Sequence, residues 1–201
     1  MKTISLLLVF CVVALNLNAQ SDENPKTIFG NGTPDMGYFI RPTCSFGKIA
    51  GTTAVLPGVG MGIILNNKLS LSLNYKLIVT ENTPVGEADT RLYLDQQYFG
   101  LKCEYSIFPI SPVHANFYLD SGVGHTELDL KDAFEFDYYD QTDASFGYLE
   151  PGAAIELNIW KYIRMDFGAG YRFASKVTYR SLTEKNLVGV NYFVGLKIGI
   201  F

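Results

Sequence analysis

Cysteine, histidine, tryptophan and strong charge of either sign are scarce in this chain. Its 201 residues include three cysteines, two histidines and one tryptophan, and the formal net charge at pH 7 is −4. So mild a negative charge excludes the basic surface that is typical of nucleic-acid-binding proteins. We therefore expect no nucleic-acid partner.

Long apolar runs are also missing beyond the first residues. An apolar run at 4–15 follows Lys2 and ends just before Leu17-Asn18-Ala19. This pattern predicts a secretory signal peptide at 1–19 that is cleaved before Gln20. Two asparagines interrupt the run too early for a spanning helix, which needs about 20 apolar residues. No later stretch approaches that length, so any membrane crossing has to use β-strands.

A two-residue alternation dominates the rest of the sequence. In the segment 69–77, LSLSLNYKL, apolar or aromatic residues occupy the odd positions and polar residues the even ones. A period of two predicts a β-strand whose two faces differ in chemistry. The same pattern returns in eight segments, at about 37–47, 54–65, 69–80, 93–107, 113–125, 147–159, 162–174 and 188–200.

The connections between these segments have a regularity of their own. Links after the second, fourth and sixth strands are short, whereas those after the third, fifth and seventh are long, at about 81–92, 126–146 and 175–187. The link after the first strand is intermediate. Transmembrane β-barrels share this asymmetry, with short periplasmic turns and longer outer loops. The sequence therefore predicts an all-β fold, an eight-stranded antiparallel up-and-down transmembrane barrel.

This barrel defines the expected domain organisation. After the signal peptide we expect a periplasmic N-terminal segment at 20–35 and a single barrel domain at 36–201. Cys44 and Cys103 fall on the apolar face of strands that are not neighbours. We therefore expect free, lipid-facing thiols, although exported proteins often form disulfides.

The polar face of the strands carries many glycines and nearly balanced charges. On a solvated outer face these glycines would cost backbone entropy without any gain in packing, whereas inside a narrow barrel they make room for long side chains. Charges that fill a lumen must be paired, because an unpaired buried charge is strongly destabilising. We therefore predict a polar lumen, an apolar exterior facing lipid, and an ion-pair network of Arg41, Lys76, Lys102, Glu104, Asp120, Glu150, Glu156, Arg164, Asp166, Arg172 and Lys197.

Several segments resemble the small outer-membrane β-barrel family of Bacteroidetes-type and other Gram-negative bacteria, often called porin-family proteins. The resemblance covers about 36–201 and rests on the Ala19/Gln20 junction, Gly122-Val-Gly124, Phe167-Gly-Ala-Gly-Tyr171 and the closing strand Tyr192–Phe201. Family members end in an aromatic residue that resembles a barrel-assembly signal, but Phe201 is out of phase with the outward-facing series. The resemblance implies an architecture and no particular activity.

An outer-membrane location follows from this resemblance. We expect contact with outer-membrane lipids and lipopolysaccharide, with the barrel-assembly machinery during biogenesis, and with an extracellular partner of unknown kind. The protein is expected to be a monomer and to need no cofactor.

The expected loop at 126–146 is the best candidate for surface interaction. It interleaves acidic and aromatic side chains, and on a rigid scaffold such a loop can bind a partner. It lacks the glycine-bearing twelve-residue pattern of a calcium loop, so we predict no metal site. The candidate interaction residues are Glu127, Asp129, Asp132, Glu135, Asp137, Tyr138, Tyr139 and Asp140.

Three other functions remain as alternatives. A lipid-modifying enzyme of the acylhydrolase type needs a nucleophile beside a base, but Glu127 occupies the place two positions after His125 where a resemblance to the deacylase arrangement would require a serine. A diffusion pore would be narrow, because side chains fill an eight-stranded lumen. A soluble ligand-binding barrel would place the apolar face inside. We expect a non-enzymatic protein.

Overall fold

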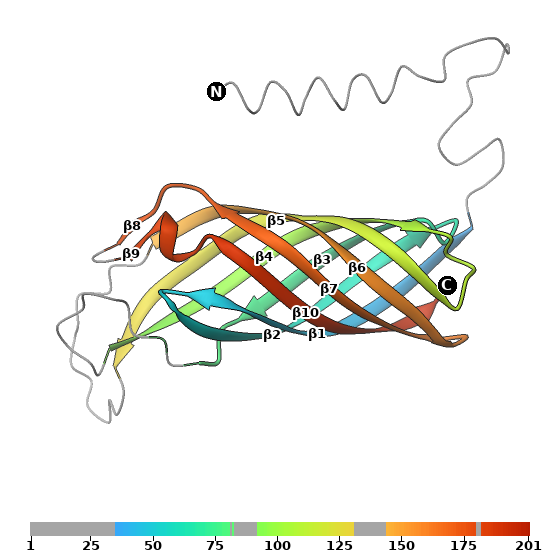
Figure 1. Ribbon diagram of the computed structural model, residues 1–201, viewed down its shortest axis with the longest axis horizontal. Helices are drawn as coiled ribbons and strands as arrows, with labels where there is room; N and C mark the ends of the chain where they lie inside the picture. Colours follow the sequence, from blue (N-terminus) through green and yellow to red (C-terminus); the bar gives the residue numbers. More distant parts are fainter. Residues whose placement is uncertain (1–34, 81, 83–91, 131–143, 180–181) are drawn as a thin grey trace, which may run out of the picture. The chain divides into compact units, whose positions relative to one another are not determined.

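Eight of the strands close into one antiparallel barrel. The computed structural model describes residues 35–80, 82, 92–130, 144–179 and 182–201, so the predicted signal peptide and most of the 20–35 segment lie outside it. Around the barrel the strands follow the order β1-β10-β7-β6-β5-β4-β3-β2, and every pairing is antiparallel (Figure 1). Apart from β1 with β10, which close the barrel, each strand pairs with its sequence neighbour. The predicted eight-stranded up-and-down barrel is confirmed.

The strand bounds lie close to those expected from the alternation. The barrel strands are β1 (Met36–Ile49), β2 (Thr52–Leu65), β3 (Leu69–Leu77), β4 (Leu92–Ile107), β5 (Val113–Leu130), β6 (Ala144–Trp160), β7 (Ile163–Ala174) and β10 (Gly189–Ile200). A small hairpin, β8 (Thr178–Tyr179) with β9 (Leu182–Thr183), and the 3₁₀ turn η1 (Glu184–Asn186) lie between β7 and β10.

Two predicted connections are wrong in length. The link after β1 is not intermediate but a two-residue turn, in which Ala50 and Gly51 both have positive φ (52° and 81°). Hairpins favour such turns because their twist matches that of the flanking strands. The link at 126–146 is shorter than expected, because β4 and β5 stay paired from Ile107↔Ala115 as far as Leu92↔Leu130.

The burial of side chains alternates as predicted. On β3, Ser70, Ser72 and Asn74 are buried, whereas Leu71 and Leu73 between them are exposed. The same parity runs around the barrel and places the charged residues inside and the aliphatic and aromatic residues outside. This is the reverse of a soluble ligand-binding barrel, so the polar-in orientation is confirmed.

The two ends of the barrel differ. The turns at 66–68, 108–112 and 161–162 lie at one end together with Phe201. The β1–β2 turn, the described part of the β7–β10 connection, the start of β4 and the end of β5 lie at the other (Figure 1). We call these the short-turn end and the loop end. Among the described residues no helix is long and apolar enough to cross a membrane. Exposed aromatic residues mark both ends, with Tyr38, Tyr105, Trp160 and Tyr162 at the short-turn end and Phe46, Phe99, Tyr171 and Phe173 toward the loop end.

Candidate functional site

The centre of the lumen holds an ion-pair network that links five strands. Glu104 on β4 accepts bonds from Arg41 on β1 (2.5 Å) and Lys197 on β10 (2.7 Å). Arg41 also contacts Asp166 on β7 (3.2 Å), and Lys197 also contacts Glu156 on β6 (2.5 Å). Each of these charges therefore has at least one opposite charge within bonding distance, which offsets the cost of its burial.

Two further groups of charges extend this network toward the ends. On the loop side, Lys76 contacts Asp120 (2.9 Å) and Arg172 contacts Glu150 (3.1 Å). On the short-turn side, Arg164 contacts Glu156 (3.2 Å). The carboxylate of Glu156 also lies 3.1 Å from Nε2 of His114. All eleven charged residues proposed from the sequence for the lumen are buried there.

Lys102 is held differently from the other lumen cations. Its ammonium lies 3.0 Å from Glu104, 3.9 Å from the ring centre of Tyr118 and 4.2 Å from that of Phe193. Cations favour the negative face of an aromatic ring, more strongly where water is excluded. The two rings meet edge to face with their centres 5.6 Å apart. The sequence pattern contains no signal for this sandwich, because its members lie on three separate strands.

Little space remains between these side chains. A cavity beside Arg41, Asn74, Lys102 and Asp120 offers about 10 Å³ to the centre of a water molecule. That is at the lower limit for one ordered water. At this level the lumen is therefore a closely packed polar core.

The lumen is not polar along its whole length, which corrects the prediction. At the loop end the inward positions of four strands are apolar or aromatic. Together with Ile78, which follows β3, the β1–β2 turn and two residues of the β7–β10 connection, they form one cluster. We call this the apolar plug; it consists of Ile49, Ala50, Ala54, Leu56, Ile78, Leu94, Tyr98, Phe146, Tyr148, Val177 and Leu187. The parity of Leu56, Ile78 and Leu94 could have revealed it, but the contribution of Val177 and Leu187 could not be read from any alternation.

Hydrogen bonds tie the β7–β10 connection and Asn82 to the end of β1 and the β1–β2 turn. The amide of Ala50 donates to the carbonyl of Asn186 (2.9 Å), which ties η1 to the β1–β2 turn. The side-chain amide of Asn82 donates to the carbonyl of Ile49 (3.2 Å). These bonds pair backbone groups that burial would otherwise leave without partners.

The C-terminal residue lies inside the short-turn end. The ring of Phe201 stacks on that of Phe39, with their centres 6.5 Å apart, and the guanidinium of Arg164 lies 3.9 Å from the Phe201 ring centre. The same guanidinium donates to the side chain of Asn67 (2.8 Å). Phe201 has the parity of the inward-facing residues of β10, and its ring accordingly lies at the short-turn end of the lumen.

The predicted interaction loop is only partly within the described residues. Glu127 and Asp129 belong to β5, opposite Asp95 and Tyr93 of β4, because the β4–β5 pairing continues past the expected loop boundary. Their assignment to a loop is therefore wrong. The remaining candidates lie outside the described residues, namely Asp132, Glu135, Asp137, Tyr138, Tyr139 and Asp140.

The outward face of β4 and β5 changes character near the loop end. Toward the middle of the barrel this face carries Phe99 and Val123, and toward the loop end it carries Gln97 and His125. Nδ1 of His125 lies 3.3 Å from the hydroxyl oxygen of Ser145 on β6. A serine thus approaches this histidine from the neighbouring strand, although none is adjacent in the sequence.

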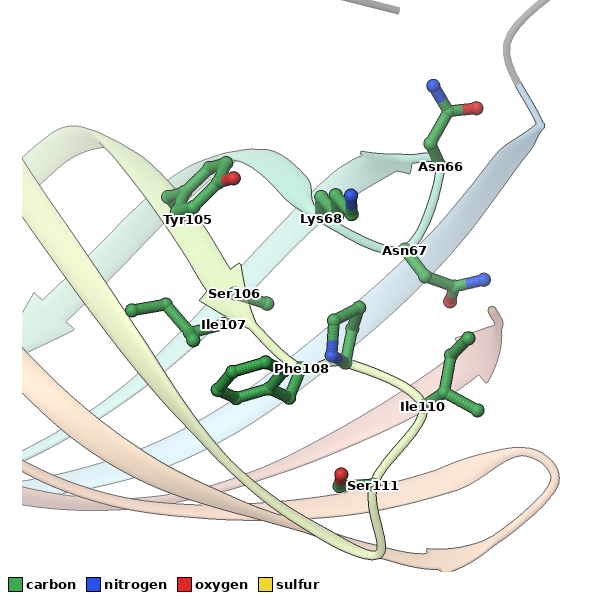
Figure 2. A pocket seen from close by; sticks show the side chains of 10 residues that line it. Asn66, Asn67, Lys68, Tyr105, Ser106, Ile107, Phe108, Ile110 and Ser111 are labelled. Carbon is green, nitrogen blue, oxygen red and sulfur yellow. The ribbon is translucent and has the colours of Figure 1, made fainter.

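The short-turn end carries a groove between two turns. Figure 2 shows Asn66, Asn67 and Lys68 on one side and the 108–111 turn on the other. The groove has a volume of about 500 Å³, and Tyr105 and Ile107 of β4 form part of its wall. It lies outside the lumen.

An eight-stranded antiparallel barrel with a charged core and an apolar exterior is the fold of the small outer-membrane β-barrel proteins. Neisserial surface protein A (NspA) has a solved structure that matches with a TM-score of 0.58 at 13% identity, over 83% of this chain and 99% of that one. The N-terminal β-barrel domain of OprF from Pseudomonas aeruginosa matches with a TM-score of 0.53 at 12% identity, over 84% of this chain and 100% of that one. No family model and no curated protein sequence matches the chain. At such low identity the likeness shows the fold.

Proposed function

We propose that this protein is an integral outer-membrane β-barrel of the Gram-negative cell envelope, with a structural or surface-interaction role. The observation that carries the proposal is the apolar belt around a charged core. Met61, Leu101 and Phe117 on this belt are each about half exposed or more. In water such a continuous apolar surface would drive aggregation, whereas in a bilayer it matches the hydrocarbon.

The sealed lumen supports a role other than conduction. The ion-pair network occupies its centre, the apolar plug closes the loop end, and Arg164 with Phe201 lies across the short-turn end. Opening a path would separate buried ion pairs, each costly to leave without a partner. We therefore propose that the barrel conducts ions very weakly, if at all.

The loop end is the proposed interaction surface. There β4 and β5 continue beyond the apolar belt with Asp95 and Glu127, and the acidic and aromatic segment 131–143 follows β5 in the sequence. Binding residues are often placed on loops that a rigid scaffold positions. We propose that an extracellular partner binds at this end. We also propose that the barrel is a monomer surrounded by outer-membrane lipids and lipopolysaccharide. The barrel-assembly machinery would insert it into the membrane. The proposal includes no nucleic acid and no cofactor.

We further propose that the barrel is not an enzyme. The contact between His125 and Ser145 is the arrangement that comes nearest to a nucleophile with its base, but Ser145 is exposed on a strand surface. Acyl transfer also needs donors aimed at a developing oxyanion. The backbone amide of Gly147, two residues beyond Ser145, already donates to the hydroxyl oxygen of Ser175 (2.9 Å).

The test is expression of the full chain in a Gram-negative host, followed by fractionation and gel electrophoresis with and without boiling. We expect the protein in the outer-membrane fraction, with a folded band that shifts on boiling, and almost no conductance in planar bilayers. Recovery as a soluble periplasmic protein would overturn the location. Deletion of 131–143 should leave the heat shift intact, while hydrolysis of lipid esters that His125→Ala and Ser145→Ala both abolish would overturn the non-enzymatic proposal.

A further inference from the structure

We propose that the groove between the 66–68 and 108–111 turns binds the headgroup of an anionic phospholipid from the leaflet at the short-turn end. The inference rests on the proposed insertion into the membrane and adds a specific lipid site to it. Its three supports are the chemistry of the rim, the apolar wall, and the depth at which the two meet (Figure 2).

The rim of the groove offers hydrogen-bond donors. The side-chain oxygen of Asn66 already accepts from the amide of Asp35 (2.9 Å), and that of Asn67 accepts from Arg164 (2.8 Å). Both side chains can still offer an NH₂ donor to a ligand. The ammonium of Lys68 is exposed and makes no ion pair within the described part of the chain. None of the ten lining residues is acidic. Such a rim suits a ligand that only accepts, as a phosphate does.

The wall of the groove continues the apolar belt of the barrel. Tyr105 and Ile107 lie on the outer face of β4, and the chain then enters the turn at Phe108. Phe108 is 77% exposed and has φ of 56°, a conformation that a bulky residue rarely adopts. The turn thus holds a large ring outward, beside the belt. An acyl chain passing along the belt would cover this ring while its headgroup reaches the rim.

Lys68 and the exposed aromatic residue Tyr105 lie at the same depth along the barrel. The carbonyl of Lys68 accepts from the amide of Ser106 (2.7 Å), and Leu69 pairs with Tyr105. Tyrosine and tryptophan mark the headgroup level of membrane proteins, and Tyr105 belongs to the exposed aromatic set of this end. Lys68 is therefore placed where lipid phosphates lie, and its charge complements theirs.

The experiment compares bound lipids on the intact barrel. The full mature protein is placed in nanodiscs of equal amounts of phosphatidylcholine and phosphatidylglycerol, and native mass spectrometry measures which lipid stays bound. We expect phosphatidylglycerol to be enriched. Lys68→Gln should reduce this enrichment roughly fivefold, the factor that corresponds to about 1 kcal/mol for one lysine near an anionic surface. Phe108→Gly, which tolerates the positive φ, should reduce the retention of both lipids.

Lys161→Gln is the matched control, because Lys161 carries the same charge at the same end but does not line this groove. It should keep most of the enrichment. Equal losses for Lys68→Gln and Lys161→Gln would overturn the site, since general attraction would then explain both. Displacement by excess inorganic phosphate would show that a lipid is not required and would also overturn it. A barrel with a normal heat shift but no lipid preference would refute this inference and leave the proposed function standing.

Discussion

The ring of Tyr118 lies against the bare backbone of Gly152 inside the barrel. A Cβ atom at position 152 would come within 2.4 Å of the Tyr118 hydroxyl oxygen and 2.5 Å of the Ala169 carbonyl oxygen. A Cβ atom at position 170, on the neighbouring strand β7, would come equally close to the same hydroxyl oxygen. Glycine is thus required here for space, because a Cβ atom would overlap the aromatic ring that covers Lys102.

Gly152→Ala is accordingly expected to destabilise the folded barrel by about 1–3 kcal/mol, the usual cost of overpacking a well-packed core. The measurement is the urea midpoint of the heat-resistant band in lipid vesicles. Gly189→Ala is the control, because nothing lies within 4 Å of a Cβ at that position. Equal midpoints for the two variants would contradict the packing of Tyr118.

Glu104→Gln should destabilise the barrel more strongly. Glu104 contacts Arg41, Lys102 and Lys197, so its neutralisation leaves buried cations short of a counter-charge. Breaking a buried pair in this way costs roughly 3–5 kcal/mol. Unfolding of the vesicle-inserted protein in guanidinium measures the change. Adding Lys102→Met should recover part of the loss, and a double variant less stable than the single one would argue against the network.

Leu101→Arg and Gln97→Arg test the position of the membrane on a single face of β4. Leu101 lies on the apolar belt, whereas Gln97 lies beyond Phe99 toward the loop end. An arginine near the bilayer midplane costs roughly 2–4 kcal/mol, but about 0–1 kcal/mol near the interface. We expect poor insertion for Leu101→Arg and near-normal insertion for Gln97→Arg, measured by the fraction of heat-shifted protein. Similar insertion of the two variants would show that the membrane boundary does not lie between Leu101 and Gln97.

Leu187→Ala tests the apolar plug. Leu187 is almost fully buried, yet it belongs to a connection and not to a barrel strand. The substitution should loosen the β7–β10 connection without unfolding the barrel, because the strand ladder makes no use of this side chain. Trypsin cleavage after Lys176 and Lys185 should become faster while the heat shift stays unchanged. Val190→Ala, on the outer face of β10, should leave the cleavage rate as it is.

The sequence by itself determined the strands and their parity. Residues 69–77 alternate without a break, and in an antiparallel ladder each register slip of one residue would place charges such as Lys76 in lipid. The identity of the buried charges followed directly, since the inward face of each strand can be read from its parity. The free thiols of Cys44 and Cys103 followed from the same parity, and the structure shows both unpaired.

Only the tertiary structure decided which charge meets which, and which residues of a connection complete the apolar plug. Arg41 and Asp166 are 125 positions apart in the chain, and their 3.2 Å contact depends on barrel closure through the pairing of β1 with β10. The plug depends on Val177 and Leu187, which come from a connection without any periodic pattern. The groove beside Lys68 exists because two turns, distant in sequence, lie side by side at one end. Alternation is a property of each strand alone, whereas these contacts arise from the stagger and closure of all eight.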